Sequence, residues 1–197
     1  MRFLALGDSY TIGEGVAEAE RWPVRLAALL REGGLSVAEP EIIARTGWTT
    51  DELSDAIDLP RPEGPYELVT LLIGVNNQYR GRSVEEYREQ FHALLERAVG
   101  FAGGEAGRVV VLSIPDWGVT PFAAGRDRAQ IAAEIDRFNA VSREETERRG
   151  ARWVDVTAQS RGTGADVAAD GLHPGPASYE AWARAALPAA RAGLAGS

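Results

Sequence analysis

Three residues whose side chains can carry out acyl transfer stand near the two ends of the sequence. Ser9 follows a short apolar run, and Asp170 and His173 are three residues apart in a segment rich in glycine and small residues. A histidine held by a carboxylate can take the proton of a serine hydroxyl, which makes that oxygen a nucleophile toward an ester carbonyl. Pro174 disfavours helical geometry at His173. Asp170 is close enough in sequence to bond Nδ1 and leave Nε2 for Ser9.

Two further residues, Asn76 and Gly47, would complete the inventory for acyl transfer. A side-chain amide and a backbone N–H can both donate to a developing oxyanion, where one donor is typically worth about 3–4 kcal/mol. Each residue also has a purely structural interpretation. Ser9 can cap a helix, His173 can be an ordinary loop histidine, Asn76 suits a turn and Gly47 can end a strand. No single residue is sufficient evidence for catalysis, so the prediction depends on the order in which all of them occur along the chain.

Short apolar runs alternate with longer amphipathic segments over residues 1–197, which predicts a single domain. Continuous runs rich in β-branched residues predict buried parallel strands, whereas amphipathic spacing and capping residues predict helices. We predict strands over 3–6, 41–44, 68–73, 109–114 and 153–156. We predict helices over 23–31, 50–57, 83–101 and 127–149, a last helix that begins at Pro176, and an irregular loop over 158–172.

The strand–helix alternation predicts the α/β class, with a three-layer α/β/α sandwich built on a parallel sheet. In such sheets, ligands bind outside the carboxyl ends of the strands. Ser9, Gly47 and Asn76 each follow a predicted strand. We therefore expect them to meet at one edge of the sheet, together with the loop that holds Asp170 and His173.

The order of these motifs resembles the signature of a known family. The motifs are Gly7-Asp8-Ser9, Gly47, Gly74-x-Asn76 and Asp170-x-x-His173-Pro174. They resemble the four blocks of the SGNH hydrolase superfamily, the GDSL-like esterases and lipases, in the family's order and over nearly the whole chain. The first and last blocks are each moderately specific, and the combination of all four is strong.

The resemblance implies a flavodoxin-like sheet of five parallel strands and no metal or organic cofactor. It also implies a serine carboxylic ester hydrolase with Ser9 as nucleophile, His173 as general base and Asp170 as the residue that orients the imidazole. The backbone N–H groups of Ser9 and Gly47, with the side chain of Asn76, would form the oxyanion hole.

Two positions depart from the family pattern. Tyr10 stands where the family usually has leucine, which leaves the nucleophile unaffected. Asn77 stands where the family usually has aspartate after the block-three asparagine. Asn77 keeps the shape of that side chain and loses its charge, which puts in question how this loop is braced.

Composition excludes several other chemistries. The chain has no cysteine, so disulfides, cysteine-ligated zinc, iron–sulfur clusters and thiol nucleophiles are ruled out. Two histidines are too few for a three-histidine metal site in one chain. The net charge of −8 disfavours nucleic-acid binding. No apolar run is long enough for membrane insertion, and the amino terminus turns polar too early for a signal peptide, so we expect a cytoplasmic protein.

The expected partner is a small-molecule ester, and the sequence constrains its identity weakly. Four aromatic residues are placed to line an acyl or alcohol pocket, although core packing explains each of them equally well: Trp48, Tyr79, Trp117 and Phe122. Arg80 and Arg82 could contact an anionic substrate, but solvated loop charges are the simpler interpretation. Charged helices and the lack of an obvious lid favour short-chain acyl or acetyl esters over an interfacial lipase.

Other functions use the same residues. The resemblance also permits lysophospholipase and thioesterase activities. An acyltransferase would use the same serine with an acceptor other than water, and a non-catalytic ligand-binding relative would keep the sheet without turnover. The intact Ser9, Asp170 and His173 argue against a non-catalytic protein, whereas sequence does not separate hydrolysis from transfer. It does not reveal the oligomeric state either.

Overall fold

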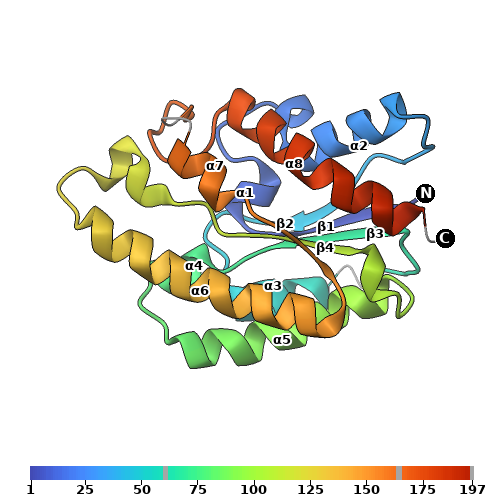
Figure 1. The fold of residues 1–197 in the computed structure, drawn as a ribbon, viewed down its shortest axis with the longest axis horizontal. Helices are drawn as coiled ribbons and strands as arrows, with labels where there is room; N and C mark the ends of the chain where they lie inside the picture. Colours follow the sequence, from blue (N-terminus) through green and yellow to red (C-terminus); the bar gives the residue numbers. More distant parts are fainter. Residues whose placement is uncertain (60–61, 163–165, 196–197) are drawn as a thin grey trace.

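A parallel five-stranded sheet lies at the centre of the computed structural model, which describes residues 1–59, 62–162 and 166–195 (Figure 1). The strands are β1 (Phe3–Gly7), β2 (Glu41–Ala44), β3 (Leu68–Leu72), β4 (Val109–Leu112) and β5 (Arg152–Val154). Their spatial order is β2-β1-β3-β4-β5. All residues of β1, β3 and β4 are buried, as expected for parallel strands covered on both faces. The predicted fold class and parallel sheet are therefore confirmed.

Two layers of helices enclose the sheet (Figure 1). On one face, α2 (Trp22–Glu32) and α8 (Pro176–Leu194) pack side by side, and on the other face lie α3 (Thr50–Ile57), α5 (Val84–Phe101) and α6 (Arg128–Arg149). Shorter helices are α1 (Ser9–Ile12), α4 (Val75–Tyr79) and α7 (Thr157–Gly162), with 3₁₀ turns at Glu18–Glu20, Ala106–Arg108, Trp117–Val119 and Pro121–Ala123. Within the described ranges, no helix combines the length and apolar character needed to cross a membrane.

The predicted loop over 158–172 is partly wrong, because α7 occupies its first residues. The carboxylate of Asp155 accepts the backbone N–H of Ala158 at 3.1 Å, and Ser160 N–H bonds to the carbonyl of Val156 at 3.1 Å. Asp155 therefore caps a helix too short to show a hydrophobic period. Residues 163–165 of the predicted loop lie outside the described residues.

Three predicted strands end earlier than expected, at Leu72 in β3, Leu112 in β4 and Val154 in β5. For β4 and β3, local polar contacts draw the chain out of the sheet. After β4, the N–H of Ile114 bonds to the side-chain oxygen of Asn139 at 2.8 Å. After β3, the carbonyl of Ile73 accepts the hydroxyl of Tyr87 at 3.1 Å. In both places a buried backbone group is satisfied by a helix side chain in place of a neighbouring strand.

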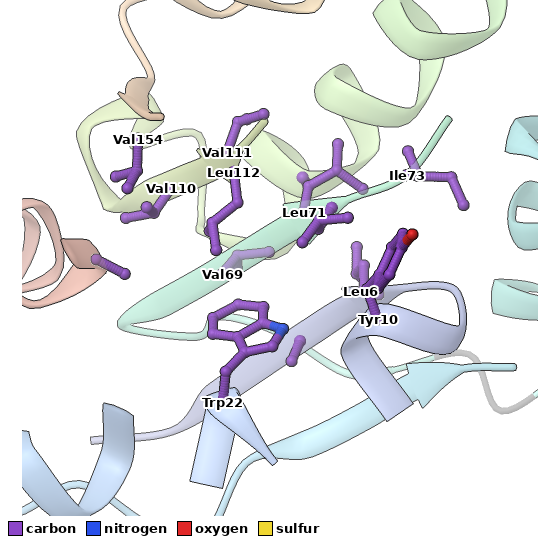
Figure 2. Close-up of a cluster of buried hydrophobic side chains, with 14 of the residues drawn as sticks. Leu6, Tyr10, Trp22, Val69, Leu71, Ile73, Val110, Val111, Leu112 and Val154 are labelled. Atoms are coloured by element: carbon purple, nitrogen blue, oxygen red, sulfur yellow. The ribbon is translucent and has the colours of Figure 1, made fainter. Parts of the chain in front are cut away.

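The core lies between the sheet and the helices. Figure 2 shows Leu6, Val69 and Leu112 from adjacent strands gathered with Trp22 of α2. All four side chains are buried, and Trp22 is completely so. Burying a large apolar side chain typically contributes about 1.5–3 kcal/mol. This packing holds the carboxyl edge of the sheet in a defined place.

Candidate active site

The register of the three neighbouring strands β2, β1 and β3 brings the predicted site residues to one edge. Gly7 at the end of β1 is level with Ala44 of β2 and with Leu72 of β3. The chain goes from β1 to β2 on one side and then to β3 on the other, which makes this edge a topological switch point, where ligands typically bind. A cavity of about 180 Å³ opens there. Its walls include four predicted site residues: Ser9, Gly47, Asn76 and His173.

Ser9 is presented by a tight strand-to-helix connection. It is the first residue of α1, directly after Asp8, whose carboxylate caps the helix by accepting the N–H of Tyr10 at 3.0 Å. The first N–H groups of a helix have no partner within the helix, so the Ser9 N–H is available as a donor. Any side chain at Gly7 would collide with Thr11 and with the carbonyl of Leu72, because its Cβ would lie 2.2 and 2.5 Å from their oxygens. Glycine is therefore required for this turn.

Asp8 is completely buried next to Ser9, the predicted nucleophile. Burial raises its pKa to about 7, although the hydrogen bond from Tyr10 N–H acts in the opposite direction. Its Oδ2 makes no hydrogen bond with any residue of the described ranges. In the folded chain, Asp8 therefore keeps its carboxyl proton to a higher pH than an aspartate in water does.

Asp170 and His173 form the predicted carboxylate–imidazole pair. Oδ2 of Asp170 lies 2.6 Å from Nδ1 of His173. The other carboxylate oxygen accepts the backbone N–H groups of Leu172 at 2.9 Å and His173 at 3.0 Å. Burial alone would raise the pKa of Asp170, but these hydrogen bonds outweigh it and hold the pKa below its usual value. The carboxylate is thus kept ionised, and Nε2 of the imidazole is left for the cavity.

Two of the predicted oxyanion donors, Gly47 and Asn76, come from the segments after β2 and β3. Gly47 has a φ of +89°, a left-handed conformation that favours glycine. The side-chain nitrogen of Asn76 donates to the carbonyl of Trp48 at 2.9 Å. An amide nitrogen carries two hydrogens, so one of them remains for a ligand in the cavity.

Asn77 braces this region through a neutral network where the family usually has a carboxylate. Its side-chain oxygen accepts the N–H of Thr50 at 3.1 Å, and its nitrogen donates to the hydroxyl of Thr50 at 2.7 Å. The same hydroxyl contacts Gln90 of α5. The fully buried amide therefore connects α4 to the first residue of α3. Asn77 is uncharged, and so are the Thr50 and Gln90 side chains that surround it.

Three of the four predicted aromatic residues line the cavity: Tyr79, Trp117 and Phe122. Their ring centroids lie between 5.5 and 6.4 Å apart, and Tyr79 and Phe122 are 47% and 40% exposed. Trp48 is not among the described residues that line this cavity. It packs against the core and contributes its carbonyl to Asn76 instead.

Some residues of the site were not singled out by sequence. Thr46, Tyr10, Val75 and Leu172 also line the cavity, and their position beside a motif residue was a usable signal. Arg126 lies 5.3–5.4 Å from the centroids of the three aromatic rings. No sequence signal pointed to it, because its loop meets Tyr79 only through the fold. The described residues contain no group of three or more His, Asp or Glu side chains placed to hold a metal ion.

Comparison with known proteins identifies relatives by family and by fold. The profile of the GDSL-like lipase/acylhydrolase family matches residues 5–181. A search of curated proteins gives no significant match. The structure is similar to that of TesA, with a TM-score of 0.77, 19% identity and coverage of 98% of this chain and 100% of that chain.

Two further solved structures share the fold. A lipase/acylhydrolase from Enterococcus faecalis has a TM-score of 0.71 and 21% identity, with 95% of this chain and 94% of that chain covered. A variant of Axe2, an acetyl xylan esterase from Geobacillus stearothermophilus, has a TM-score of 0.74 and 19% identity, with 96% and 94% covered. At these identities the likeness concerns the fold.

Proposed function

Because the chain belongs to the GDSL-like lipase/acylhydrolase family, we propose that it is a serine esterase that hydrolyses short-chain acyl or acetyl esters. The observation that carries the proposal is the composition of one cavity. Ser9, the Asp170-bound His173, Gly47 and Asn76 all meet there, although they come from four separate segments. Nucleophile, oriented base and oxyanion donors are the groups that acyl transfer requires.

The first half of the reaction forms an acyl-enzyme. Ser9 Oγ attacks the ester carbonyl carbon while its proton passes to Nε2 of His173. The carbonyl oxygen becomes an oxyanion that accepts hydrogen bonds from the N–H groups of Ser9 and Gly47 and from the Asn76 amide. When the carbonyl re-forms, the bond to the leaving oxygen breaks, and His173 gives that oxygen its proton to release the alcohol.

The second half returns the enzyme to its starting state. A water molecule attacks the acyl carbon and transfers a proton to His173. Collapse of the second tetrahedral intermediate releases the carboxylic acid, and the proton returns to Ser9 Oγ. The ionised Asp170 stabilises the imidazolium that exists in both halves, and it keeps the ring in the tautomer with hydrogen on Nδ1.

The size and lining of the cavity support a small substrate. Its volume of about 180 Å³ lies below the roughly 300–1,000 Å³ of pockets that hold drug-sized ligands. The aromatic residues Tyr79, Trp117 and Phe122 offer an apolar wall for the acyl or alcohol group. Because the cavity is small, substrates with one small apolar group fit it better than long acyl chains.

A series of p-nitrophenyl esters from acetate to longer acyl chains tests the proposal. We expect activity to fall with chain length, and to fall by several orders of magnitude in Ser9→Ala and His173→Ala. Circular dichroism of both variants serves as the control for folding. Turnover that survives Ser9→Ala would rule out the mechanism. A rise in product when an alcohol is added, with the alcohol esterified, would show acyl transfer to acceptors other than water.

A further inference from the structure

An arginine outside the cavity lining holds the carbonyl of the oxyanion-loop glycine. Nη2 of Arg80 donates to the carbonyl oxygen of Gly47 at 2.6 Å. The two residues are 33 positions apart, and Arg80 follows directly after α4, the helix that begins with Val75 and Asn76. The contact therefore connects the loop after β2 to the helix that carries the other oxyanion donor.

The guanidinium is itself held in place by a carboxylate. Nη1 of Arg80 lies 3.1 Å from Oε1 of Glu52. The other oxygen of Glu52 accepts the N–H of Thr49 at 2.9 Å. The Thr49 N–H hydrogen bond, helped by the Arg80 guanidinium, keeps the pKa of Glu52 below its usual value, against burial, which acts in the opposite direction. Glu52 therefore stays ionised. Gly47 is thus linked to Arg80, Arg80 to Glu52, and Glu52 to Thr49, which follows Gly47 closely in the same loop.

A second bond from the same helix holds the next carbonyl of this loop. The Asn76 side chain donates to Trp48, so α4 and the residue after it hold two successive carbonyl groups. On the other side of the glycine, the hydroxyl of Thr46 donates to the carboxylate of Glu14. Gly47 is thus restrained from both directions.

This restraint matters because glycine has the greatest backbone freedom of any residue. An oxyanion donor acts only if it already points to the position where charge develops, without reorganisation during the reaction. A half-buried loop glycine with φ of +89° does not keep one orientation by itself. The Gly47 N–H belongs to the peptide unit that precedes this carbonyl, and Gly47 φ and ψ connect the two units. Holding the carbonyl through Arg80 restricts ψ, and together with the Thr46 contact it limits the directions in which the N–H can point.

We propose that Arg80 is a positioning residue for the oxyanion hole, which acts by clamping the Gly47 peptide to α4. The inference rests on the proposed function, because it requires the Gly47 N–H to be an oxyanion donor. Arg80 does not touch the reacting atoms in this proposal, and its effect is on the transition state more than on the bound ester.

The test compares Arg80→Gln and Arg80→Lys with Arg82→Gln. Arg82 is a matched control, because it also pairs with α3, at Asp51 (2.9 Å), and with Glu86 (3.0 Å). We expect kcat on p-nitrophenyl acetate to fall about 10- to 100-fold in Arg80→Gln, below the loss typical of deleting a donor. We expect a smaller fall in Arg80→Lys, which lacks the planar fork, and a change within about twofold in Arg82→Gln.

A second readout separates positioning from general damage to the fold. An alkylboronic acid forms a tetrahedral adduct on a serine nucleophile and so probes the oxyanion hole. We expect its inhibition constant to rise in parallel with the loss of kcat in Arg80→Gln, while KM stays within about threefold. Unchanged kcat in Arg80→Gln, or an equal loss in Arg82→Gln, would overturn the inference.

Glu52→Gln keeps the proposal testable if Arg80→Gln does not fold. We expect a loss of kcat in the same direction because Arg80 loses its charged anchor, and an unchanged kcat in this variant would count against the clamp. Failure of the esterase proposal is distinguishable from failure of the clamp. In the former case Ser9→Ala retains turnover, and in the latter Ser9→Ala is inactive while the Arg80 variants behave as wild type.

Discussion

The ring of Tyr10 lies edge-on to the imidazole of His173, with centroids 5.8 Å apart and an interplanar angle of 65°. Tyr10 is buried and makes a similar edge contact with Trp182 of α8. The imidazole is therefore held on two sides, by Asp170 at Nδ1 and by an aromatic ring that packs against it. Tyr10, which departs from the family's usual leucine, contributes to the orientation of the proposed base.

Replacing this ring should reduce catalysis without removing the triad. We expect Tyr10→Leu to lower kcat by up to about tenfold, because an aromatic pair is typically worth about 0.5–1.5 kcal/mol. Tyr10→Phe retains the ring and should stay within about twofold of wild type. Steady-state kinetics on p-nitrophenyl acetate measures both. Equal losses in the two variants would show that the ring contact is not the cause.

Asp170→Asn should abolish most of the activity while the loop keeps its shape. The asparagine oxygen can still accept the backbone N–H groups of Leu172 and His173. Its nitrogen cannot accept from Nδ1, so the imidazole adopts the wrong tautomer, and we expect kcat to fall roughly 10³- to 10⁴-fold. Near-ultraviolet circular dichroism checks the fold. A loss below tenfold would contradict the role given to Asp170.

Asn76→Ala should remove one proposed oxyanion donor. We expect kcat to fall about 10²- to 10³-fold with little change in KM. The Trp48 carbonyl also loses its partner, so the free energy of unfolding should drop by about 1 kcal/mol. Kinetics and urea unfolding measure the two effects separately. If KM rises while kcat is retained, Asn76 serves substrate binding instead.

Asn77→Asp would test whether the neutral brace depends on its amide. A carboxylate can accept from Thr50 N–H but cannot donate to the Thr50 hydroxyl or toward Gln90. We expect the free energy of unfolding to fall by about 1–3 kcal/mol, with kcat changed less than threefold. Unchanged stability in urea unfolding would mean that Gln90 reorients its amide without cost.

Asp8 should make stability depend on pH in a defined direction. Its pKa is raised to about 7 in the folded chain, against 3.8 for an ordinary aspartate. Between those values the unfolded chain has lost the proton and the folded chain keeps it, so stability falls as pH rises from about 4 to 7. Above pH 7 both states are ionised, and the destabilisation is complete and constant.

Asp8→Asn isolates this effect. The variant leaves a buried amide N–H without a partner, which costs the same at every pH. Its stability relative to wild type should still improve from pH 4 to pH 8, by a few kcal/mol at most, on the order of 1.4 kcal/mol per pKa unit. Unfolding in urea at both pH values measures the difference. A difference that does not change with pH would show that Asp8 titrates normally.

The parts of the fold that sequence predicted are those with long or strongly apolar patterns. The strands β1, β3 and β4 are continuous apolar runs, and α6 repeats its buried positions over several turns. The helices α1, α4 and α7 were missed, because four to six residues are too few to show a helical period. The strand order also required the structure, since pairing partners are not encoded locally.

For the predicted site too, some contacts could be predicted from the sequence and others could not. The bond between Asp170 and His173 was predictable because both lie in one short loop. The contact of Arg80 with Gly47 was not, because nothing in either segment signals a partner 33 positions away. Arg80 and Arg82 were interpreted as solvated charges, and their side chains are indeed 42% and 24% exposed, but both are also paired with carboxylates of α3. Ion pairs between distant segments depend on tertiary packing.

The proposed nucleophile follows the first strand, whereas the proposed base comes after the fifth, just ahead of α8. During translation, a ribosome that has produced every strand has still not delivered the imidazole. On the proposed mechanism, a nascent chain therefore cannot hydrolyse esters before the segment that carries His173 has emerged and folded against the sheet. The onset of turnover in a cell-free translation reaction would thus mark synthesis beyond the segment that carries His173, and a product that stops before this segment would carry an inactive Ser9.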